Sequence, residues 1–376
     1  MSSESPETDA TGLSDWLRLT LISGIGGESQ RKLLTAFGLP HHVFAAGHLA
    51  QRQIVASKAD LLAEAHSAAM DEKIAAALAW ASAPDCHILT LADALYPPQL
   101  LEIPDPPTLL YVRGNPAALA RPGIAVVGSR NATPQGLKIA EDFAHTLADA
   151  GFVLISGLAL GIDAAAHSGA LASQRAESTV AVIGTGADRL YPARNQALAR
   201  RIVEHGAIVS EFPLGTPALA ANFPRRNRVI SGLARGVLVV EAATESGSLI
   251  TARLACEQGR EVFAIPGSIH SPLSRGCHRL LRQGAKLVES AQDILEELGA
   301  YLTPPSPPSV VAPSSPTDVA ATEESRVLTH LGYDPCTLDE LALRAELPAD
   351  ALLALLLNLE LAGRIAPLPG NRYQRL

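Results

Sequence analysis

Three arginines and an aromatic ring lie within six consecutive positions of this chain. The segment consists of Phe223, Pro224, Arg225, Arg226, Asn227 and Arg228. Guanidinium groups bind phosphate through two parallel hydrogen bonds, and an aromatic ring can stack on the face of any nucleic-acid base. These residue types in such close succession therefore predict a segment that contacts a phosphate backbone and a base together.

We expect this segment to open a helix, because proline is favoured at the first helical position. Arg225 and Arg228 are three residues apart and would then share one face of the helix, with the two residues between them rotated away. The alternative is a solvated helix face on which the arginines form ion pairs with Glu241 or Glu245. The clustering of the arginines favours contact with phosphate, since isolated surface ion pairs contribute little.

A proline follows Phe223, which biases this residue toward an extended backbone. Its ring is therefore expected to point outward and to offer a stacking surface to a base. The alternative is a phenylalanine that is buried in the core under the loop. The two alternatives differ in where the ring lies, at a surface cleft or inside the core.

Short apolar segments alternate with glycine turns and amphipathic helical patterns from residue 123 to about residue 298. Near-continuous apolar character is typical of parallel strands that are buried on both faces. We therefore predict an α/β fold with an extended Rossmann-like, doubly wound, mostly parallel sheet. The expected strands cover residues 124–127, 152–155, 180–183, 208–210, 237–240 and 262–265.

The glycine turns follow these strands, and the carboxyl ends of the strands in a doubly wound sheet converge on one crevice. Glycine lets the backbone approach an anion closely, and the N-terminus of the next helix supplies unpaired N–H groups. Arg130 would lie at the mouth of the crevice, where a phosphate meets a guanidinium and free amides together. The candidate binding residues in these turns are Gly128, Ser129, Arg130, Ser156, Gly157, Gly161, Gly184 and Gly186.

Catalysis and cofactor binding are not expected. The turns at 128–132 and 184–189 do not complete the G-x-G-x-x-G pattern of a nicotinamide site. Residues 284–287 lack the leading glycine and the final hydroxyl of a nucleoside-triphosphate loop. Asp163 and His167 lie four apart on one helical face, but no nucleophile or second base is near them in the sequence. The eleven histidines form no metal-spaced cluster, so we expect no catalytic residue, no metal and no cofactor.

The composition is that of a globular protein. With 376 residues, 47% of them hydrophobic and 18% charged, the chain is long enough for two or three domains. A net charge of -8 argues against nonspecific coating of nucleic acid and restricts any such site to a local basic patch. The four cysteines are far apart, which is typical of reduced thiols in the cytosol. We find no secretory signal and no membrane-spanning apolar run, so we expect a cytoplasmic protein with no membrane partner.

Changes in composition divide the chain into five parts. We expect a disordered tail at 1–12, a helical domain at 13–85, the Rossmann-like domain at 86–299, a linker rich in proline and serine at 300–322 and a winged-helix-like domain at 323–376. The helical domain is similar to sterile-alpha-motif or helix-hairpin-helix domains and has a glycine hairpin at 21–27. This hairpin could offer N–H groups to a phosphate, but it contains no lysine or arginine, which favours a simple tight turn.

The C-terminal part has three helical patterns and a hairpin, which is the outline of a winged helix. A helix that reads duplex DNA needs basic and amide side chains, whereas residues 348–362 are mainly aliphatic. We therefore expect a surface for protein contact, or weak DNA contact through Arg364, Arg372 and Arg375.

Several motifs stand in the order in which they occur in the DNA-processing protein A family, also called DprA or Smf. They are Val-Val-Gly-Ser-Arg at 126–130, Ser-Gly-Leu-Ala-Leu-Gly-Ile-Asp at 156–163, Gly-Thr-Gly at 184–186 with Tyr191 and Pro192, Phe-Pro-Arg-Arg-Asn-Arg at 223–228, Ser-Gly-Ser at 246–248 with Thr251 and Ala252, and Pro-Gly at 266–267. The chain resembles this family across residues 87–298. Its winged-helix-like domain is similar to the small C-terminal domain found in many members.

The resemblance implies a cytoplasmic, non-enzymatic protein that binds incoming single-stranded DNA during natural transformation, protects it and loads the RecA recombinase. Members look like homodimers formed through the Rossmann-like domain, so the implied partners are single-stranded DNA, RecA and a second copy of the chain. The residues that match the family's phosphate-binding turn are Gly128, Ser129 and Arg130. Those that match its second DNA-contacting segment are Phe223, Arg225, Asn227 and Arg228, whereas Arg226 stands where other residues also occur.

The alternative function is that of a Rossmann-like nucleotide-processing enzyme of the phosphoribohydrolase type, to which the glycine-rich crevice is distantly similar. Such an enzyme needs a glycine-rich loop that ends in threonine and a glutamate positioned for the ribose. Residues 246–251 run into Ala252 and Arg253 and lack that glutamate. They read as a turn that opens a helix, with Ser246 as its cap or, alternatively, as a cradle for phosphate.

Overall fold

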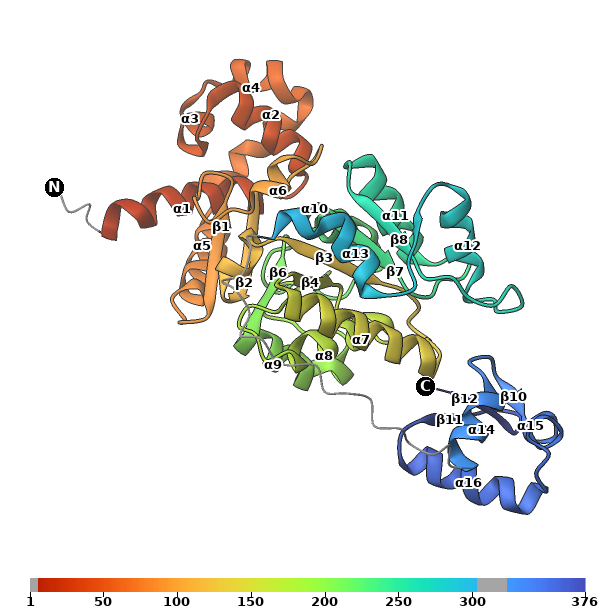
Figure 1. The fold of residues 1–376 in the computed structure, drawn as a ribbon. Coiled ribbons are helices and arrows are strands. Elements are labelled where there is room, and N and C mark those ends of the chain that lie inside the picture. The colour runs from red at the N-terminus through yellow and green to blue at the C-terminus, as the bar shows by residue number, and fades with distance from the viewer. Residues whose placement is uncertain (1–5, 303–322, 376) are drawn as a thin grey trace.

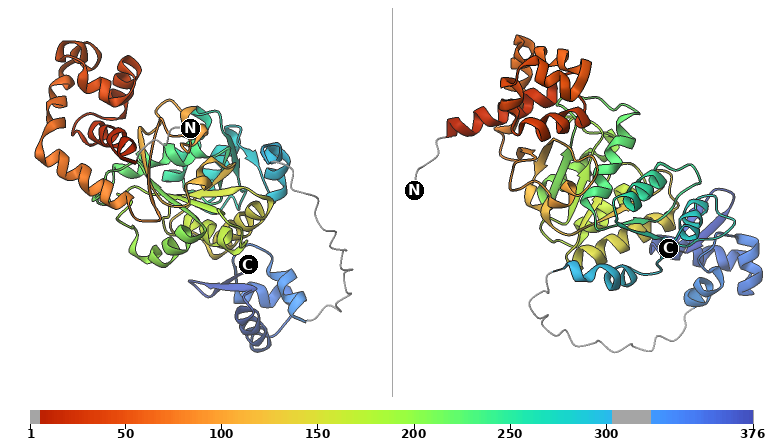
Figure 2. Two further views of the ribbon diagram at one scale, coloured as in Figure 1. Left: turned by 90° about the vertical axis from the view of Figure 1, so that its left-hand side faces the viewer. Right: turned by 90° about the horizontal axis from the view of Figure 1, so that it is seen from above.

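The computed structural model describes residues 6–302 and 323–375, which form three parts (Figure 1). A helical domain and a small C-terminal domain lie at opposite ends of a large α/β domain (Figure 2). Residues 303–322 of the expected linker and 1–5 of the expected tail lie outside the described residues. The first helix begins at Pro6, within the segment 1–12 that we expected to be a disordered tail.

The N-terminal domain is helical, as expected. It contains α1 (Pro6–Leu21), α2 (Gly27–Phe37), α3 (Pro40–Ala45), α4 (His48–Val55), the 3-10 helix η1 (Ala56–His66) and α5 (Ala68–Ala81). Leu17, Leu33 and Val43 are fully buried in its core. The glycine turn joins α1 to α2, and Gly24 in it has a φ of +84°. A Cβ on Gly24 would lie 2.8 Å from Leu61 Cδ1, so both backbone and space require glycine there.

In the described part of the chain, nine strands form the central sheet, in the order β1-β2-β6-β5-β4-β3-β7-β8-β9. They are β1 (Cys86–Thr90), β2 (Leu109–Gly114), β3 (Gly123–Val127), β4 (Val153–Ser156), β5 (Thr179–Val182), β6 (Gly206–Ser210), β7 (Gly236–Val239), β8 (Glu261–Ala264) and β9 (Lys286–Leu287). Strands β3 to β9 pair in parallel, and β1 and β2 form an antiparallel edge beside β6. Every residue of β3 and β6 is buried, which explains their continuous apolar sequence. The prediction of a mostly parallel doubly wound sheet is confirmed.

Helices cover both faces of this sheet (Figure 1). They are α6 (Pro98–Leu101), η2 (Pro116–Ala120), α7 (Pro134–Ala150), α8 (Ile162–Ala172), η3 (Ala193–Asn195), α9 (Gln196–His205), α10 (Asn222–Leu233), α11 (Gly247–Glu257), α12 (Arg275–Arg282), α13 (Ala291–Leu298) and η4 (Gly299–Tyr301). Residues of α10 and α11 share one apolar core, and residues of α7, α8 and α13 share another. The chain adds β4, β5 and β6 on one side of β3 and then β7 on its other side, which makes the boundary between β3 and β7 the switch point.

The C-terminal domain has the winged-helix outline that the sequence predicts. Its elements are α14 (Glu323–Leu331), β10 (Cys336–Thr337), α15 (Leu338–Ala345), α16 (Ala349–Leu361), β11 (Ile365–Leu368) and β12 (Arg372–Arg375). The strands pair in the order β10-β12-β11, and Leu341, Leu352 and Ile365 are buried in the domain's own core.

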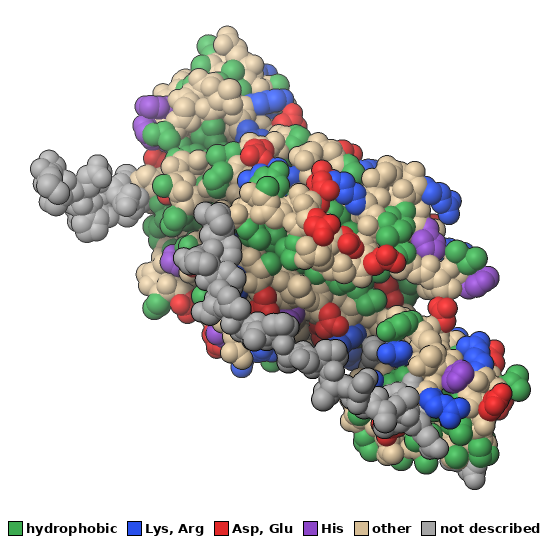
Figure 3. Space-filling model, in the orientation of Figure 1, with side chains coloured by type: hydrophobic (Ala, Val, Ile, Leu, Met, Phe, Trp, Pro, Cys, Tyr) green, Lys and Arg blue, Asp and Glu red, His purple; other side chains and the backbone are tan. Residues whose placement is uncertain are grey.

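Acidic and basic side chains are interspersed on the face of the molecule shown in Figure 3. That face has no broad basic surface, so a site for a phosphate chain on it would have to be a local feature. Among the described residues, no helix is long and apolar enough to cross a bilayer. The same residues hold no group of three His, Cys, Asp or Glu side chains that could bind a metal ion.

Candidate nucleic-acid interface

A cleft of about 740 Å³ opens at the switch point, outside the carboxyl ends of β3 and β7. We call it the switch-point cleft, and its walls are the turn after β3, the first turns of α10 and the turn that leads into α11. The sequence-predicted residues that line it are Gly128, Ser129, Arg130, Phe223, Arg226 and Asn227. Gly157 lines a small adjoining hollow. The structure therefore joins the arginine-rich segment to the first glycine turn.

A cation and two aromatic rings stand together at the mouth of the cleft. Arg130 is exposed, and its Cζ lies 5.6 Å from the centroid of the Phe223 ring. The Tyr191 ring lies 5.8 Å from the Phe223 ring and is 49% exposed. Phe223 is half-buried and lines the cleft, so it is not a core residue. Sequence reasoning missed Tyr191 as a site residue, although it belongs to the Tyr-Pro pair that carried part of the resemblance.

Arg226 forms part of the floor of the cleft and is only 5% exposed. Its Nη1 donates to the carbonyl of Val182, and a Cβ on Gly157 would overlap the guanidinium. Burial lowers the pKa of Arg226 to about 10, and the nearby Asp163 carboxylate opposes that shift. The side chain therefore stays positively charged at neutral pH and is fixed beneath the cleft.

Asp163 and His167 are both buried in α8, and Asp163 is among the residues that line the same cleft. Asp163 accepts hydrogen bonds from the backbone N–H groups of Gly157 at 3.1 Å and Ala159 at 3.3 Å. Burial raises the pKa of this carboxyl, whereas Arg226 and the amides lower it. His167 Nδ1 lies 2.7 Å from Thr179 Oγ1, and burial lowers the pKa of the imidazole to about 3. The aspartate thus holds the turn after β4, and the histidine is neutral at physiological pH.

Two glycines let neighbouring turns pack closely against one another. Gly161 has a φ of +77°, and a Cβ there would overlap the backbone carbonyl of Ser129. A Cβ on Gly128 would lie 2.6 Å from Ile162 Cγ1 and 2.9 Å from the carbonyl oxygen of Glu241. We expected glycine here so that the backbone could approach an anion. The contacts show an additional reason, namely the packing of turn against turn, and the approach of an anion stays a prediction.

Gly161 is not among the described residues that line the cleft, and three further candidates are not among them either. Ser156 is buried, and its hydroxyl donates to the carbonyl of Val126 at 2.6 Å. Gly184 packs against the Phe223 ring, because a Cβ there would lie 3.2 Å from Phe223 Cδ1. Gly186 is buried in the loop after β5, where a Cβ would meet the carbonyl oxygen of Pro213 at 2.7 Å.

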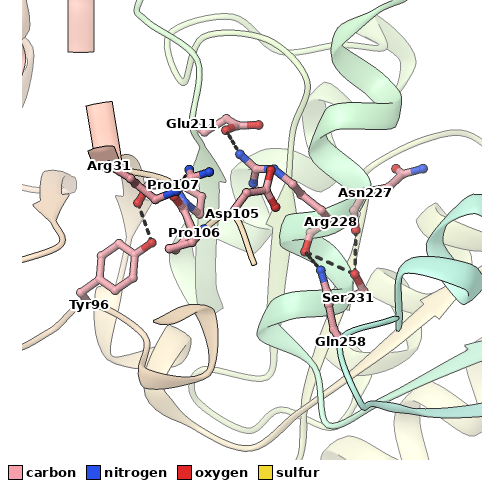
Figure 4. Close-up of polar contacts among 10 residues, drawn as sticks. All are labelled: Arg31, Tyr96, Asp105, Pro106, Pro107, Glu211, Asn227, Arg228, Ser231 and Gln258. Atoms are coloured by element: carbon pink, nitrogen blue, oxygen red, sulfur yellow. Dashed lines mark hydrogen bonds and ion pairs between the residues drawn. The ribbon is translucent and has the colours of Figure 1, made fainter. Parts of the chain in front are cut away.

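Arg225 and Arg228 share one face of α10, as predicted, but that face points away from the switch-point cleft and lines a second groove. Arg228 Nε lies 2.7 Å from Asp105 Oδ2, and its Nη2 lies 2.5 Å from Glu211 Oε2 (Figure 4). Burial raises the pKa of Glu211, and Arg228 opposes that rise. Arg225 is exposed, with its Cζ 5.3 Å from the centroid of the Phe212 ring.

The expected alternative partners of these arginines, Glu241 and Glu245, were the wrong carboxylates. Glu241 instead accepts hydrogen bonds from the Thr133 hydroxyl at 2.6 Å and the Thr133 backbone N–H at 2.9 Å. Glu245 lines the switch-point cleft. The ion pairs form with Asp105 and Glu211, which precede β2 and follow β6, because α10 packs over those two loops.

The N-terminus of α11 forms another wall of the cleft. Ser246 is its N-cap and accepts a hydrogen bond from the backbone N–H of Ser248, so the capping prediction is confirmed. Gly247 and Thr251 also line the cleft, and Asn227 Nδ2 donates to the carbonyl of Gly247 at 3.4 Å. The cleft is therefore lined both by a helix N-terminus, with its partial positive charge, and by Arg130.

A doubly wound sheet with such a cleft at its switch point defines a Rossmann-type binding protein. The pattern of the family described as DNA recombination-mediator protein A matches residues 87–299, and that of the DprA winged helix domain matches residues 311–371. The chain belongs to the DNA recombination-mediator protein A family.

Relatives of known structure or sequence cover most of the chain. It is 42% identical to Protein Smf of Escherichia coli (strain K12) over 96% of this chain and 95% of that protein. The crystal structure of DNA processing protein A from Streptococcus pneumoniae matches with a TM-score of 0.66 and 38% identity, over 75% of this chain and 95% of that one. A second match is DNA processing protein A from Helicobacter pylori, for which a single-stranded DNA binding mode has been described. It has a TM-score of 0.52 and 30% identity, over 57% of this chain and 96% of that one.

Proposed function

We propose that this chain is a cytoplasmic recombination mediator that binds incoming single-stranded DNA during natural transformation, protects it and loads RecA onto it. Its family membership and its likeness to the Helicobacter pylori protein support this function. The observation that carries it is the grouping of Arg130, Phe223 and Tyr191 at one cleft mouth. A phosphate binder beside two rings matches the alternating phosphates and bases of an open strand.

In this account each wall of the switch-point cleft has one role. A phosphate binds at Arg130 and the N-terminus of α11, where a charged fork and the partial positive charge of a helix start line the same cleft. Phe223 and Tyr191 stack on bases, since neither ring is enclosed by the core. Arg226 adds a fixed positive charge from the floor, and Asn227 positions the α11 turn.

The hydrogen bonds of the buried titratable groups near the cleft are consistent with a site that binds DNA without catalysing a reaction. Asp163 already accepts two backbone hydrogen bonds, and the neutral His167 faces Thr179. Arg226 is bound to the carbonyl of Val182. None of these three groups has the geometry of a general base beside a nucleophile, so we assign them to holding the cleft in shape.

Two partners complete the proposal. A homodimer formed through the Rossmann-like domain would bring two clefts together on one strand, and RecA would receive the strand from that assembly. The winged-helix-like domain is proposed to contact protein or to bind DNA weakly through Arg364, Arg372 and Arg375. These assignments rest on the family resemblance.

The deciding experiment is RecA strand exchange on single strands coated with the protein. The wild type should stimulate the reaction, Arg130→Ala should not, and Arg200→Ala, which removes an exposed arginine from α9, should behave as the wild type does. Absence of stimulation by the wild type would contradict the mediator function. Turnover of a nucleoside monophosphate by the purified protein would instead support the phosphoribohydrolase alternative.

A further inference from the structure

A second groove, of about 410 Å³, lies between the N-terminal helical domain and the Rossmann-like domain. We call it the hairpin groove, because the glycine turn at 24–27 forms one of its walls. Arg225, Arg228 and the loop before β2 form the facing wall. The sequence showed no cation in the hairpin itself. The fold brings cations to it from other parts of the chain.

On the helical-domain side, the groove is lined by backbone amides that no side chain caps. Gly26 is the N-cap of α2, an eleven-residue helix, and makes no side-chain capping bond. Gln30 Nε2 donates to the carbonyl of Ile25 at 2.9 Å and so braces the turn. Lys58 also lines the groove, and its Nζ lies 3.3 Å from Ser29 Oγ in the first turn of α2. An exposed ammonium group therefore stands next to an uncapped helix N-terminus.

On the Rossmann side, the loop before β2 is held firmly. The Tyr96 hydroxyl donates to the carbonyl of Pro107 at 2.6 Å, and Arg31 Nη1 donates to the carbonyl of Pro106 at 3.1 Å. The Arg228 pairs with Asp105 and Glu211 fix the same loop against α10 (Figure 4). This wall is therefore preformed.

Polar groups without partners mark the interior of this wall. Thr108 lines the groove and is 4% exposed, and its hydroxyl has no hydrogen-bond partner among the residues that the structure describes. Arg228 Nη1 and Glu211 Oε1 are also buried without partners. Buried polar atoms are seldom left unpaired, so their clustering here indicates a site that is completed by a ligand or its bound water. The charged side chains that line the groove are Lys58, Arg225, Arg228 and Glu211, which favours an anion.

The hairpin groove and the switch-point cleft lie on two faces of the same short helical segment. Phe223 and Arg226 face the cleft, whereas Arg225 and Arg228 face the groove. The loop after β6 lines both, through Phe212 in the groove and Ala218 in the cleft. A helix with its side chains is about 10 Å across, so a strand that fills the cleft needs a few further nucleotides to reach the groove.

We propose that the hairpin groove binds a phosphodiester of the same single strand that occupies the switch-point cleft. The inference rests on the proposed function. Lys58, Arg225 and the amides at the start of α2 contact the phosphate, and Arg228 holds the wall in place. The helical domain thereby extends the path of the strand beyond the Rossmann-like domain.

The test compares two lengths of oligo-dT with the full chain. An oligomer of about 5 nucleotides occupies the cleft alone, whereas one of about 20 nucleotides reaches the groove as well. Lys58→Ala should reduce the log–log salt slope by about 0.7 for the longer oligomer and leave the shorter one unchanged. Lys73→Ala is the matched control, because Lys73 is an exposed lysine in α5 of the same domain. Lys58→Glu should weaken binding of the longer oligomer further.

Other outcomes of this experiment show whether the groove proposal or the proposed function has failed. Equal behaviour of Lys58→Ala and Lys73→Ala on both oligomers would overturn the groove proposal while leaving the cleft intact. If Lys58→Ala lost the same affinity for both oligomers, the groove proposal would also be overturned. A loss of affinity seen only with duplex DNA would refute the assignment of the groove to a single strand. Competition by inorganic phosphate or dTMP with no effect of oligomer length would indicate a site for a free anion. Failure of the wild type to bind either oligomer would refute the proposed function itself.

Discussion

The guanidinium of Arg130 lies over the ring of Phe223, with Cζ 5.6 Å from the ring centroid. The two residues come from separate segments, the turn after β3 and the first turn of α10. Their contact holds the group that we propose to bind phosphate against the ring that we propose to stack on a base. The proposed site is therefore preorganised, which would reduce the conformational entropy lost on binding a strand.

Stacking is tested by removing each ring separately. Phe223→Ala should weaken oligo-dT binding by about 1–3 kcal/mol with little change in the salt slope, because a stacked base carries no charge. Tyr191→Ala should act in the same direction, whereas Phe223→Tyr should retain affinity. The measurement is fluorescence anisotropy at several salt concentrations. Normal binding by a folded Phe223→Ala variant would show that the ring only fills space.

Arg228 is expected to contribute more to stability than to binding. Its side chain is 12% exposed and pairs with two carboxylates, so Arg228→Ala leaves the buried Glu211 without its partner. We expect the free energy of unfolding in urea to fall by about 3 kcal/mol. Arg225→Ala on the same helix face is the control and should change it by about 0.5 kcal/mol. An unchanged unfolding free energy together with a reduced salt slope would identify Arg228 as a phosphate contact instead.

Gly161 is required by the packing of two turns. Its φ is +77°, and an added Cβ would overlap the carbonyl of Ser129, so Gly161→Ala should lower the free energy of unfolding by about 1–3 kcal/mol. A Cβ added at Gly247 would meet no atom within 4 Å, so Gly247→Ala is a suitable control for stability. Thermal unfolding of both variants compares them directly. Equal stability of the two would show that the turns can separate.

Burial of His167 makes stability depend on pH. Its pKa is about 3 in the fold and about 6.5 in an unfolded chain. Below pH 6.5 the unfolded state binds a proton that the folded state does not, so this contribution is lost as the pH falls from 6.5 toward 3. The loss amounts to about 2 kcal/mol at pH 5, at 1.36 kcal/mol for each unit.

The check is urea unfolding of the wild type and His167→Gln at pH 7 and pH 5. The variant should lose less stability between these two conditions. Burial raises the pKa of Asp163, which gives a pH dependence of the opposite sign, but this carboxyl is present in both proteins. A difference between pH 7 and pH 5 that is the same in both proteins would contradict the assignment.

Local sequence was sufficient to predict the sheet and the approximate position of the cleft. The apolar run of β3 is buried on both faces, and the turn after it has to lie at the switch point because the sheet is doubly wound. The shared face of Arg225 and Arg228 also follows from local rules. The helix start was predicted wrongly, because α10 begins at Asn222, two residues before Pro224, and Phe223 is therefore helical and not extended.

Long-range packing could not be predicted in the same way. Nothing near Arg228 in the sequence indicates that Asp105 and Glu211 are its partners, because loops before β2 and after β6 supply them. The burial of Arg226 likewise depends on β5, whose Val182 carbonyl accepts its hydrogen bond. Only the folded chain shows that Arg226 is buried, that Arg228 is paired with carboxylates and that Arg225 is exposed.

The central claim is that the switch-point cleft binds the phosphate of a single strand through Arg130. Its most direct test is the salt dependence of oligo-dT affinity for the wild type, Arg130→Ala and the control Arg200→Ala. We predict that Arg130→Ala binds more weakly and that its log–log salt slope falls by about 0.7, with the control unchanged. An affinity and a slope equal to those of the wild type would contradict the account.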